Sequence, residues 1–187
     1  MFKIKLLVVG PTKAGKTYLV NFLSEAIEQS TKFDYRPTKG VRIIEYEANL
    51  VVHSKKLKAD VEFWDVSGDS KYENCWPVIA KNANGIVFVY NQDQSDHDAK
   101  LDEWYSHFVR RLRMKDLQCC VIAHKKPNTA DRDIVQLTTN FDQIRSIKSN
   151  IDEAGDQLRE DFNRFLAQLI KVVNETSDQE EQSLLNA

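Results

Sequence analysis

Residues 4–17 read IKLLVVGPTKAGKT, an apolar run that is followed by the pattern Gly-x4-Gly-Lys-Thr. This pattern is typical of a phosphate-binding loop, because its glycines let successive backbone N–H groups face one anion. Lys16 supplies a positive charge for the β- and γ-phosphates, and the Thr17 hydroxyl is a ligand suited to Mg²⁺. We therefore predict a nucleotide site between a first strand and a first helix. Its predicted nucleotide contacts are Thr12, Lys13, Ala14, Gly15, Lys16, Thr17 and Tyr18.

The patterns on either side of this loop indicate an α/β fold. Strand-like stretches occupy residues 2–9, 41–52, 57–64, 85–90 and 117–123, and helical periodicity is found at residues 16–29, 75–82, 97–113 and 156–175. A further short helix is expected near residues 137–144. The second and third strands are separated by a few residues around His53 to Lys56, which leaves no room for a helix. They therefore predict an antiparallel hairpin beside an otherwise parallel sheet.

Length and composition indicate one domain. The chain has 187 residues, of which 42% are hydrophobic, and this is enough for one well-cored α/β domain. Its 26 Lys and Arg against 28 Asp and Glu give a net charge of −2, so no general attraction to nucleic acid or to an anionic membrane is expected. Cys119 and Cys120 are adjacent in an apolar run and predict buried free thiols in a reducing compartment. Residues 176–187 are polar and acidic and are expected to form a disordered tail.

Two further segments narrow the type of nucleotide-binding protein. The strand that ends at Asp65 continues as Asp-x-x-Gly, which is expected to place the Asp65 carboxylate near Mg²⁺ and the Gly68 N–H at the γ-phosphate. Upstream, Thr38 lies in a polar loop between the first helix and the hairpin, where its hydroxyl is expected to complete the metal site. The predicted metal ligands are thus Thr17, Thr38 and Asp65. This combination predicts a site that senses the γ-phosphate.

These motifs, in this order, resemble the Ras/Rab-type small GTPases over residues 2–175. RPTKGVRIIEYE at residues 36–47, WDVSGD at residues 64–69 and IAHKKP at residues 122–127 are similar to the Rab-like protein 5 branch of that family. The resemblance implies a Ras-like P-loop G domain over residues 1–175. Its sheet would be six-stranded and mostly parallel, with one antiparallel hairpin at an edge and helices on both faces. The implied ligands are GTP or GDP and Mg²⁺.

The resemblance also implies a cellular role. This branch is the small GTPase subunit of the intraflagellar transport B complex. It implies that the chain binds coiled-coil subunits of that core complex through its switch regions and supports cilium or flagellum assembly. The implied location is the cytoplasm and the cilium or flagellum, including the basal body region. Val41, Tyr72 and Trp76 are candidate partner contacts, and Trp76 is equally a candidate for the core.

The chain departs from the family at the guanine-binding motif. Where relatives carry Asn-Lys-x-Asp, this chain has His124-Lys125-Lys126-Pro127, so the carboxylate that accepts two hydrogen bonds from guanine is missing. Hydrogen bonds to charged groups are worth about 1.5–3 kcal/mol each, so we expect a weakened guanine preference. Lys125, Lys126 and the pair Ser149-Asn150 are the expected base contacts. Backbone groups near Ala123 to Lys126 or at Ser149 are expected to read the base.

Two other departures concern catalysis and membrane attachment. Asp69 stands where many relatives carry the glutamine that orients the attacking water. A carboxylate repels the γ-phosphate and, without a raised pKa, is a weak base. We therefore predict no catalytic residue and GTP hydrolysis slower than the ~10⁻⁴ s⁻¹ of unassisted relatives. No cysteine follows Cys120, so a prenyl anchor is not expected.

Two other functions are compatible with the phosphate-binding loop. One is a pseudo-GTPase that serves as a constitutive scaffold. The other is a nucleotide or small-molecule kinase, which needs an arginine-rich lid. Arg110, Arg111 and Arg113 are the dense arginines of the chain, and they lie on a predicted helix rather than in a lid-like loop.

The remaining aromatic and histidine side chains have no predicted chemical role. Trp64 and Trp104 are expected to pack in the core. His53, His97 and His107 lack the spacing of metal ligands and are expected at the surface or at helix caps.

Overall fold

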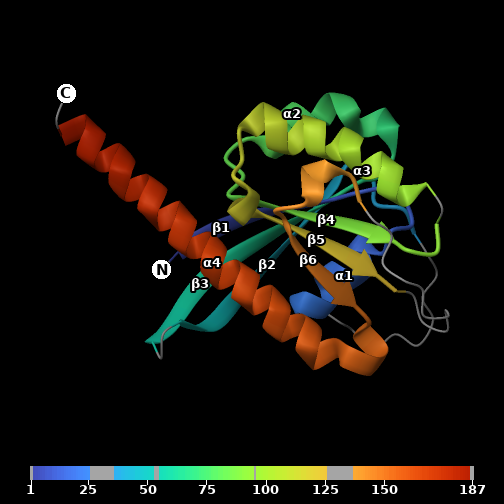
Figure 1. Ribbon diagram of the computed structural model, residues 1–187, viewed down its shortest axis with the longest axis horizontal. Helices are drawn as coiled ribbons and strands as arrows, with labels where there is room; N and C mark the ends of the chain where they lie inside the picture. The colour runs from blue at the N-terminus through green and yellow to red at the C-terminus, as the bar shows by residue number, and fades with distance from the viewer. Residues whose placement is uncertain (1, 26–35, 53–54, 95, 126–136, 186–187) are drawn as a thin grey trace.

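The computed structural model of the chain describes residues 2–25, 36–52, 55–94, 96–125 and 137–185. These residues form a six-stranded sheet in the order β2-β3-β1-β4-β5-β6 (Figure 1). The β2–β3 pair is antiparallel and the other pairs are parallel, which confirms the predicted sheet with its hairpin at one edge. The strands are β1 (Phe2–Val9), β2 (Val41–Val52), β3 (Lys55–Val66), β4 (Gly85–Asn91), β5 (Cys119–His124) and β6 (Arg145–Ser149).

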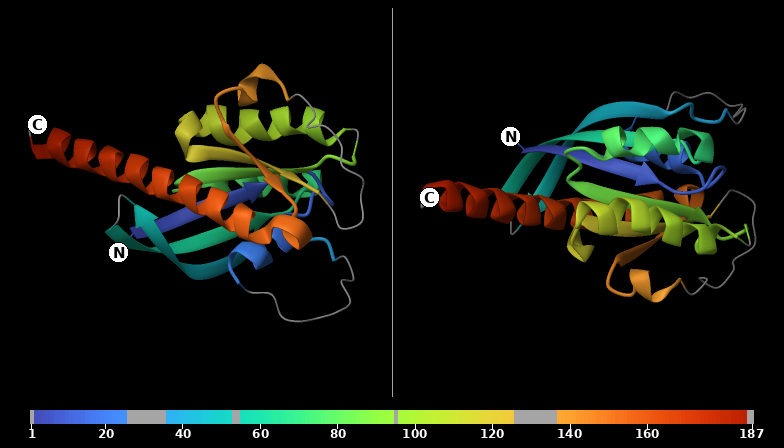
Figure 2. Two further views of the ribbon diagram at one scale, coloured as in Figure 1. Left: turned by 60° about the horizontal axis from the view of Figure 1, so that its bottom comes forward. Right: turned by 90° about the horizontal axis from the view of Figure 1, so that it is seen from above.

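Helices cover both faces of the sheet (Figure 2). They are α1 (Lys16–Leu23), α2 (Trp76–Ala80), α3 (His97–Tyr105), which continues as a π-helical segment (Ser106–Arg110), and α4 (Ile151–Leu185). Strand β1 illustrates the cause, because successive side chains of a strand point to opposite faces. Leu6 and Val8 join the cluster under α1 and α4, whereas Leu7 and Val9 join the cluster under α2 and α3.

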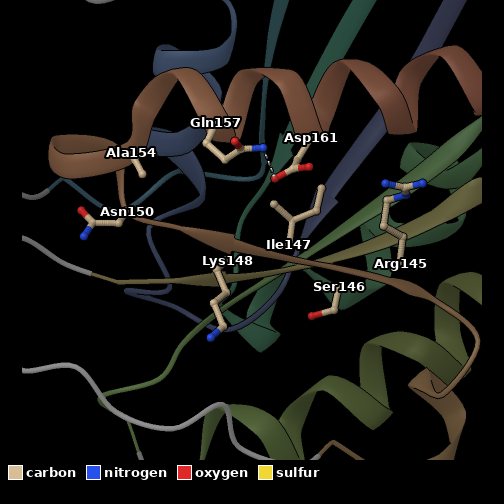
Figure 3. A pocket seen from close by; sticks show the side chains of 8 residues that line it. All are labelled: Arg145, Ser146, Ile147, Lys148, Asn150, Ala154, Gln157 and Asp161. Atoms are coloured by element: carbon tan, nitrogen blue, oxygen red, sulfur yellow. Dashed lines mark hydrogen bonds between the residues drawn. The ribbon is translucent and has the colours of Figure 1, made fainter.

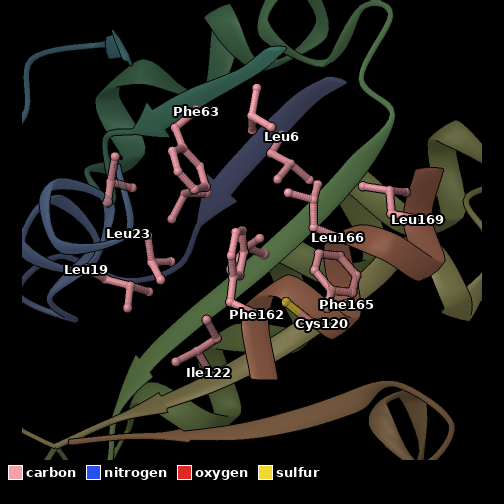
Figure 4. Packing of buried hydrophobic residues seen from close by; sticks show 14 of the residues in the cluster. Leu6, Leu19, Leu23, Phe63, Cys120, Ile122, Phe162, Phe165, Leu166 and Leu169 are labelled. Atoms are coloured by element: carbon pink, nitrogen blue, oxygen red, sulfur yellow. The ribbon is translucent and has the colours of Figure 1, made fainter. Parts of the chain in front are cut away.

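The cluster under α1 and α4 is the more directly linked to the phosphate-binding loop, because α1 follows that loop. Figure 4 shows α4 placing aromatic and aliphatic side chains on the sheet, as its predicted apolar stripe requires. The rings of Phe162 and Phe63 lie 5.6 Å apart between their centroids. Leu19 and Leu23 of α1 pack into the same cluster. Each such buried side chain contributes about 1.5–3 kcal/mol, so this cluster anchors the first turn of α1.

The two adjacent cysteines are buried on opposite faces of β5. Cys120 belongs to the cluster under α4 and Cys119 to the cluster under α3. Burial raises the pKa of Cys119 to about 12 and raises the pKa of Cys120 well above its ordinary value. Both are free thiols that remain protonated, so they act as small apolar core residues, as predicted.

The structure differs from the sequence prediction at the carboxyl end of the chain. β6 was not among the predicted strands, because of its five residues only Ile147 is a large apolar one. Helix α4 begins at Ile151, but its backbone is non-helical at Ala154, so the uninterrupted helix starts close to the predicted residue 156. It also continues to Leu185, whereas composition predicts disorder from residue 176. Glu, Gln and Leu dominate this extension, and these residues have high helix propensity, which explains its helical form.

The first helix is described as far as Leu23, and the turn that follows includes Glu25 with φ 57°. The rest of its predicted range, residues 26–29, lies outside the described residues. The predicted short helix near residues 137–144 is present as a 3₁₀ turn at Thr139–Phe141. Within the described ranges, no helix combines the length and apolar character that crossing a bilayer requires.

Candidate nucleotide-binding site

The phosphate-binding loop is held in place by close backbone packing. A Cβ atom on Gly10 would lie 2.1 Å from the carbonyl oxygen of Val89 in β4, and Gly10 has φ 139°, so only glycine fits there. Gly15 precedes the first turn of α1 with φ 97°. The Lys16 Nζ donates hydrogen bonds to the carbonyl oxygens of Gly10 and Pro11, both at 2.8 Å. The lysine therefore lies inside the curve of its own loop.

The electrostatics of the loop favour an anion. Lys16 is 6% exposed, and this burial lowers its pKa to about 8, although the nearby Asp65 raises it in part. An ammonium group that has lost its water gains more from a phosphate than an exposed one does. The first turn of α1 contains no acidic side chain, so the positive end of the helix dipole is not neutralised there. Both features point toward phosphate.

The three predicted metal ligands meet at one point. The Thr17 hydroxyl donates to Asp65 Oδ2 at 2.6 Å, and the Thr38 hydroxyl lies 3.1 Å from the Thr17 hydroxyl. Thr38 also donates to Asp65 Oδ2 at 3.3 Å. Asp65 is fully buried, and its Oδ1 atom has no hydrogen-bond partner among the residues that the structure describes. Burial raises the pKa of Asp65 above its ordinary value, and the bonds from Thr17 and Thr38 and the charge of Lys16 offset this only in part. Two hydroxyls and a carboxylate with a spare oxygen fit a hard divalent cation.

Gly68 lies directly against the phosphate-binding loop. A Cβ atom on Gly68 would lie 2.4 Å from the backbone nitrogen of Thr12 and 2.5 Å from the carbonyl carbon of Pro11. The preceding residue, Ser67, donates its backbone N–H to the carbonyl oxygen of Gly40 at 2.8 Å. The Gly68 segment therefore contacts the loop on one side and the segment that follows Thr38 on the other.

Asp69 is engaged by Lys71 and not by the loop. Its carboxylate accepts a hydrogen bond from the Lys71 backbone N–H at 3.1 Å and forms an ion pair with the Lys71 ammonium at 2.7 Å. These contacts lower the pKa of Asp69. A carboxylate with a lowered pKa accepts protons poorly. The lowered pKa of Asp69 agrees with the prediction that its carboxylate is a weak base.

The base-side residues come together at the ends of β5 and β6. The Lys125 backbone N–H donates to the Ser149 carbonyl oxygen at 2.8 Å. Asn150 uses its side chain to cap α4, with Nδ2 donating to Glu153 Oε2 at 2.5 Å and Oδ1 accepting from the Glu153 backbone N–H at 3.3 Å. Lys126 and Pro127 lie outside the described residues. The predicted base contacts that the structure describes, Lys125, Ser149 and Asn150, therefore lie together where β5 and β6 end.

The remaining loop residues differ in their exposure. Thr12 and Lys13 are exposed and Tyr18 is half-buried, whereas Ala14 is fully buried. Buried Ala14 therefore presents no side chain to a ligand. The sequence analysis did not select His124 as a site residue, yet its buried ring packs against Gly15. The signal that could have identified His124 is its position as a polar residue at the end of an otherwise apolar strand.

Several expectations about aromatic and histidine side chains are corrected by packing. Trp76 is 5% exposed and its ring centroid lies 4.4 Å from that of Trp104, so it is a core residue rather than a partner contact. Trp64 is partly buried and packs against the cluster under α2 and α3, which agrees with its expected core contact, and the Lys5 ammonium lies 3.5 Å from the centre of its ring. His97 is buried and its Nδ1 accepts a hydrogen bond from the Asn91 backbone N–H at 3.2 Å, so of its two expected positions the surface is wrong, and it lies at the start of α3 instead.

A cavity of about 450 Å³ lies between β6 and α4, away from the phosphate-binding loop (Figure 3). Its lining mixes the cations Arg145 and Lys148 with the anion Asp161, which accepts a hydrogen bond from Gln157 at 3.2 Å. It shares only Asn150 with the predicted site. With charges of both signs already present, the cavity has no evident preference for one ligand.

Comparison with known proteins agrees with this geometry. The family model described as "Ras of Complex, Roc, domain of DAPkinase" matches residues 5–127. The intraflagellar transport protein 22 homologue of Danio rerio is 40% identical over 99% of this chain and 100% of its own length. The Homo sapiens homologue is 37% identical with the same coverage.

Solved structures of a Trypanosoma brucei relative have the same fold. The GTP-bound IFT22/74/81 structure has a TM-score of 0.73 and 26% identity, covering 94% of this chain and 99% of that one. The GDP-bound IFT22 structure has a TM-score of 0.69 and 27% identity, covering 91% and 98%. The relatives that match along the whole chain and the solved structures that share the fold are thus the same kind of protein, intraflagellar transport protein 22. The chain belongs to the intraflagellar transport protein 22 (Rab-like protein 5) family of Ras-like, Roc-type small GTPases.

Proposed function

We propose that this chain is a GTP- and GDP-binding subunit of the intraflagellar transport B complex, and that Mg²⁺ and the γ-phosphate hold its switch segments in place. The observation that carries the proposal is the convergence of Thr17, Thr38 and Asp65 from three separate elements. Mg²⁺ prefers octahedral oxygen coordination and keeps several waters, so two hydroxyls, a carboxylate and phosphate oxygens suit it. The Oδ1 atom of Asp65, which has no partner within the described part of the chain, supports the assignment.

The switch segments are residues 36–40 and residues 67–72. The hydrogen bond from the Ser67 N–H to the Gly40 carbonyl oxygen couples them, so a change at one affects the other. With GTP, the Thr38 hydroxyl has a metal to bind and the Gly68 N–H has the γ-phosphate to contact. With GDP the γ-phosphate is absent, so the Gly68 N–H loses its contact and the Thr38 segment is held less firmly at the metal site. A partner that contacts both segments then has different affinities for the two states.

The proposed partners are coiled-coil subunits of the transport B core complex. The relative from T. brucei is described in its GTP-bound form together with IFT74 and IFT81, and the two folds match over 94% of this chain. Val41 and Tyr72 are partly exposed in or beside the switch segments and are the proposed contacts. The proposed role is support of cilium or flagellum assembly, in the cytoplasm and the cilium or flagellum, including the basal body region.

We expect this chain to bind GTP far more effectively than it hydrolyses it. The ion pair with Lys71 holds the Asp69 carboxylate in its charged form, which disfavours a role as base and repels phosphate. The kinase alternative has little structural support, because Arg110 donates to Asn140 Oδ1 at 2.9 Å and lies over the Tyr105 ring instead of in a lid.

The binding test uses fluorescent GTP, GDP and ATP analogues, each with Mg²⁺ and with a chelator. We expect tighter binding of guanine nucleotides than of ATP, and a stronger effect of Mg²⁺ on GTP than on GDP. Lys16→Ala is expected to lose binding, whereas Lys3→Ala, which alters an exposed lysine of β1, serves as the matched control. Equal affinity for ATP and GTP would refute the proposed guanine specificity.

The partner test measures binding of the full chain to the coiled-coil subunits with GTP, with GDP and without nucleotide. The proposal expects that GTP strengthens the complex and that Lys16→Ala weakens it. Loss of nucleotide binding in Lys16→Ala with unchanged partner binding would instead identify the chain as a constitutive scaffold.

A further inference from the structure

The end of helix α1 packs against the beginning of α4, where the two helices lie side by side (Figures 1 and 2). The contact centres on Phe22, one residue before the end of α1. A Cβ atom on Gly155 would lie 2.8 Å from Phe22 Cζ, and the Arg159 guanidinium carbon lies 4.2 Å from the centre of the Phe22 ring. Gly155 and Arg159 are four residues apart and therefore on one face of α4. The ring is thus held between a glycine that leaves room for it and a guanidinium that lies over it.

Arg159 also binds the backbone at the end of α1. Its Nη2 donates a hydrogen bond to the Phe22 carbonyl oxygen at 3.1 Å. The last carbonyl groups of a helix lack intrahelical partners and carry partial negative charge, so a cation is favourable there. The last turn of α1 contains no basic side chain of its own. Arg159 therefore supplies from α4 the positive charge that the end of α1 lacks.

The local shape of α4 and the space beside it give this contact its importance. Ala154 has a non-helical backbone, with φ −140° and ψ 37°, and Gly155 follows it directly. A cavity of about 340 Å³ adjoins the contact, lined by the end of α1, by β2 and by α4, with Arg159 among its lining residues. Close packing therefore does not enclose the end of α1 on this side. Its position depends on the contact with Gly155 and Arg159.

The end of α1 is also joined to the switch segment at residues 36–40. Arg42, which follows that segment in β2, donates from Nη2 to Asn21 Oδ1 at 2.8 Å. Asn21 lies in the last turn of α1, next to Phe22. A shift of the end of α1 is therefore passed through Arg42 to the segment that places Thr38.

We propose that Gly155 and Arg159 form a clamp on Phe22, the α4 clamp, which positions the end of α1 and thereby the Thr38 segment at the metal site. This inference rests on the proposed function. Binding of GTP with Mg²⁺ uses Thr38, whereas GDP depends mainly on the phosphate-binding loop and the first turn of α1, which Leu19 and its cluster anchor separately. Loosening the α4 clamp therefore weakens GTP binding more than GDP binding.

The first test replaces Arg159 with methionine, which keeps an unbranched apolar stem and removes the charge and the hydrogen bond. In Arg159→Met, the affinity for fluorescent GTP with Mg²⁺ is expected to fall about three- to tenfold, and the GDP affinity to stay within about twofold. This loss is smaller than that of a buried charged hydrogen bond, because Arg159 is partly exposed. Titrations are run at a temperature at which circular dichroism shows each variant to be folded.

Arg164→Met is the matched control. It makes the same substitution at an arginine of the same helix, whose side chain is 58% exposed and pairs with Glu160 and Asp161. It is expected to keep both the GTP and the GDP affinity of the wild-type chain.

The second test displaces the ring from the other side. In Gly155→Ala the added methyl group meets the tip of the Phe22 ring, so the ring is expected to leave the guanidinium and the GTP affinity to fall as in Arg159→Met. The double variant is expected to lose no more than the larger single loss, because both changes break one contact. In a Phe22→Leu chain, which lacks the ring atoms that the alanine meets, Gly155→Ala is expected to have no further effect.

The inference is overturned if Arg159→Met keeps the wild-type GTP affinity, or if GTP and GDP lose affinity equally, as a general loss of stability predicts. Multiplied losses in the double variant, or a full effect of Gly155→Ala in the Phe22→Leu chain, would also overturn it. Failure of the proposed function appears in the wild-type chain instead, as GTP binding that Mg²⁺ does not strengthen. The two failures are therefore separate observations.

Discussion

Replacing Gly68 with alanine tests how the switch segment contacts the phosphate-binding loop. The added methyl group would lie 2.4 Å from the Thr12 backbone nitrogen, and an ordinary contact begins at 3.4 Å, so the two backbones must separate by about 1.0 Å (3.4 minus 2.4). Neither neighbour is a flexible side chain, because the close atoms belong to the backbones of Gly10, Pro11 and Thr12. Overpacking of this kind costs about 1–3 kcal/mol. If the nucleotide-free chain relieves this strain by moving the loop and the complex cannot, the same free energy is lost from binding, which corresponds to about a five- to 150-fold loss of affinity.

The structure predicts that GDP and GTP both lose affinity in Gly68→Ala, because the displaced loop holds the phosphates that they share. Equilibrium titration with both fluorescent nucleotides measures this. Gly40→Ala is the matched control, since it adds a methyl group with no atom within 4 Å and introduces only the strain of φ 67°. That strain costs about 1–2 kcal/mol of stability, with little expected effect on GDP affinity. If Gly68→Ala weakens GTP alone and leaves GDP unchanged, the steric argument is refuted.

Three further predictions follow from individual contacts. Asp69→Gln removes the charge that is paired with Lys71. It is expected to raise the rate of single-turnover phosphate release by about tenfold or more, which corresponds to lowering the barrier by about 1.4 kcal/mol. An unchanged rate would show that Asp69 does not limit hydrolysis. Burial lowers the pKa of Lys16 to about 8 from 10.5, so the unfolded chain binds more protons between these values and the nucleotide-free fold gains stability as pH rises through that window. Over the same pH window Lys16 loses the positive charge that binds phosphate, so the GDP affinity measured by titration is expected to fall. A GDP affinity that does not change with pH, or that changes with the same slope in Lys16→Met, would contradict this. Trp76→Ala is expected to lower the free energy of unfolding by about 3–5 kcal/mol in a denaturant titration, whereas Tyr72→Ala, at a partly exposed site, is expected to change it by less than about 1.5 kcal/mol; equal effects would mean that Trp76 is not a core residue.

Much of the fold was predictable because its signals are local. β1 and β2 have the predicted bounds, since their runs of apolar and alternating residues need no distant partner to be recognised. β6 was missed because it carries only one large apolar residue, Ile147, and becomes a strand by pairing with β5. Similarly, the first turn of α4, which precedes the non-helical Ala154, was missed because it is too short to show a helical periodicity.

The candidate site divides in the same way. Thr17, Thr38 and Asp65 were predicted as a group because each belongs to a motif whose chemistry is visible in a few neighbouring residues. The contact between His124 and Ser149 joins residues that are 25 positions apart, and it depends on β5 and β6 being neighbours. No short pattern reports that adjacency.

The phosphate-binding loop and the hairpin are therefore readable from the residues alone, whereas the missing guanine carboxylate is recognised through the resemblance to the small GTPases. Each depends on backbone freedom, periodicity or side-chain chemistry within a short segment. The roles of Trp76, His97 and His124 were decided only by the tertiary structure, which buries all three. The physical reason is that burial and hydrogen-bond partners are properties of the elements that meet across the sheet, and these elements are distant in sequence.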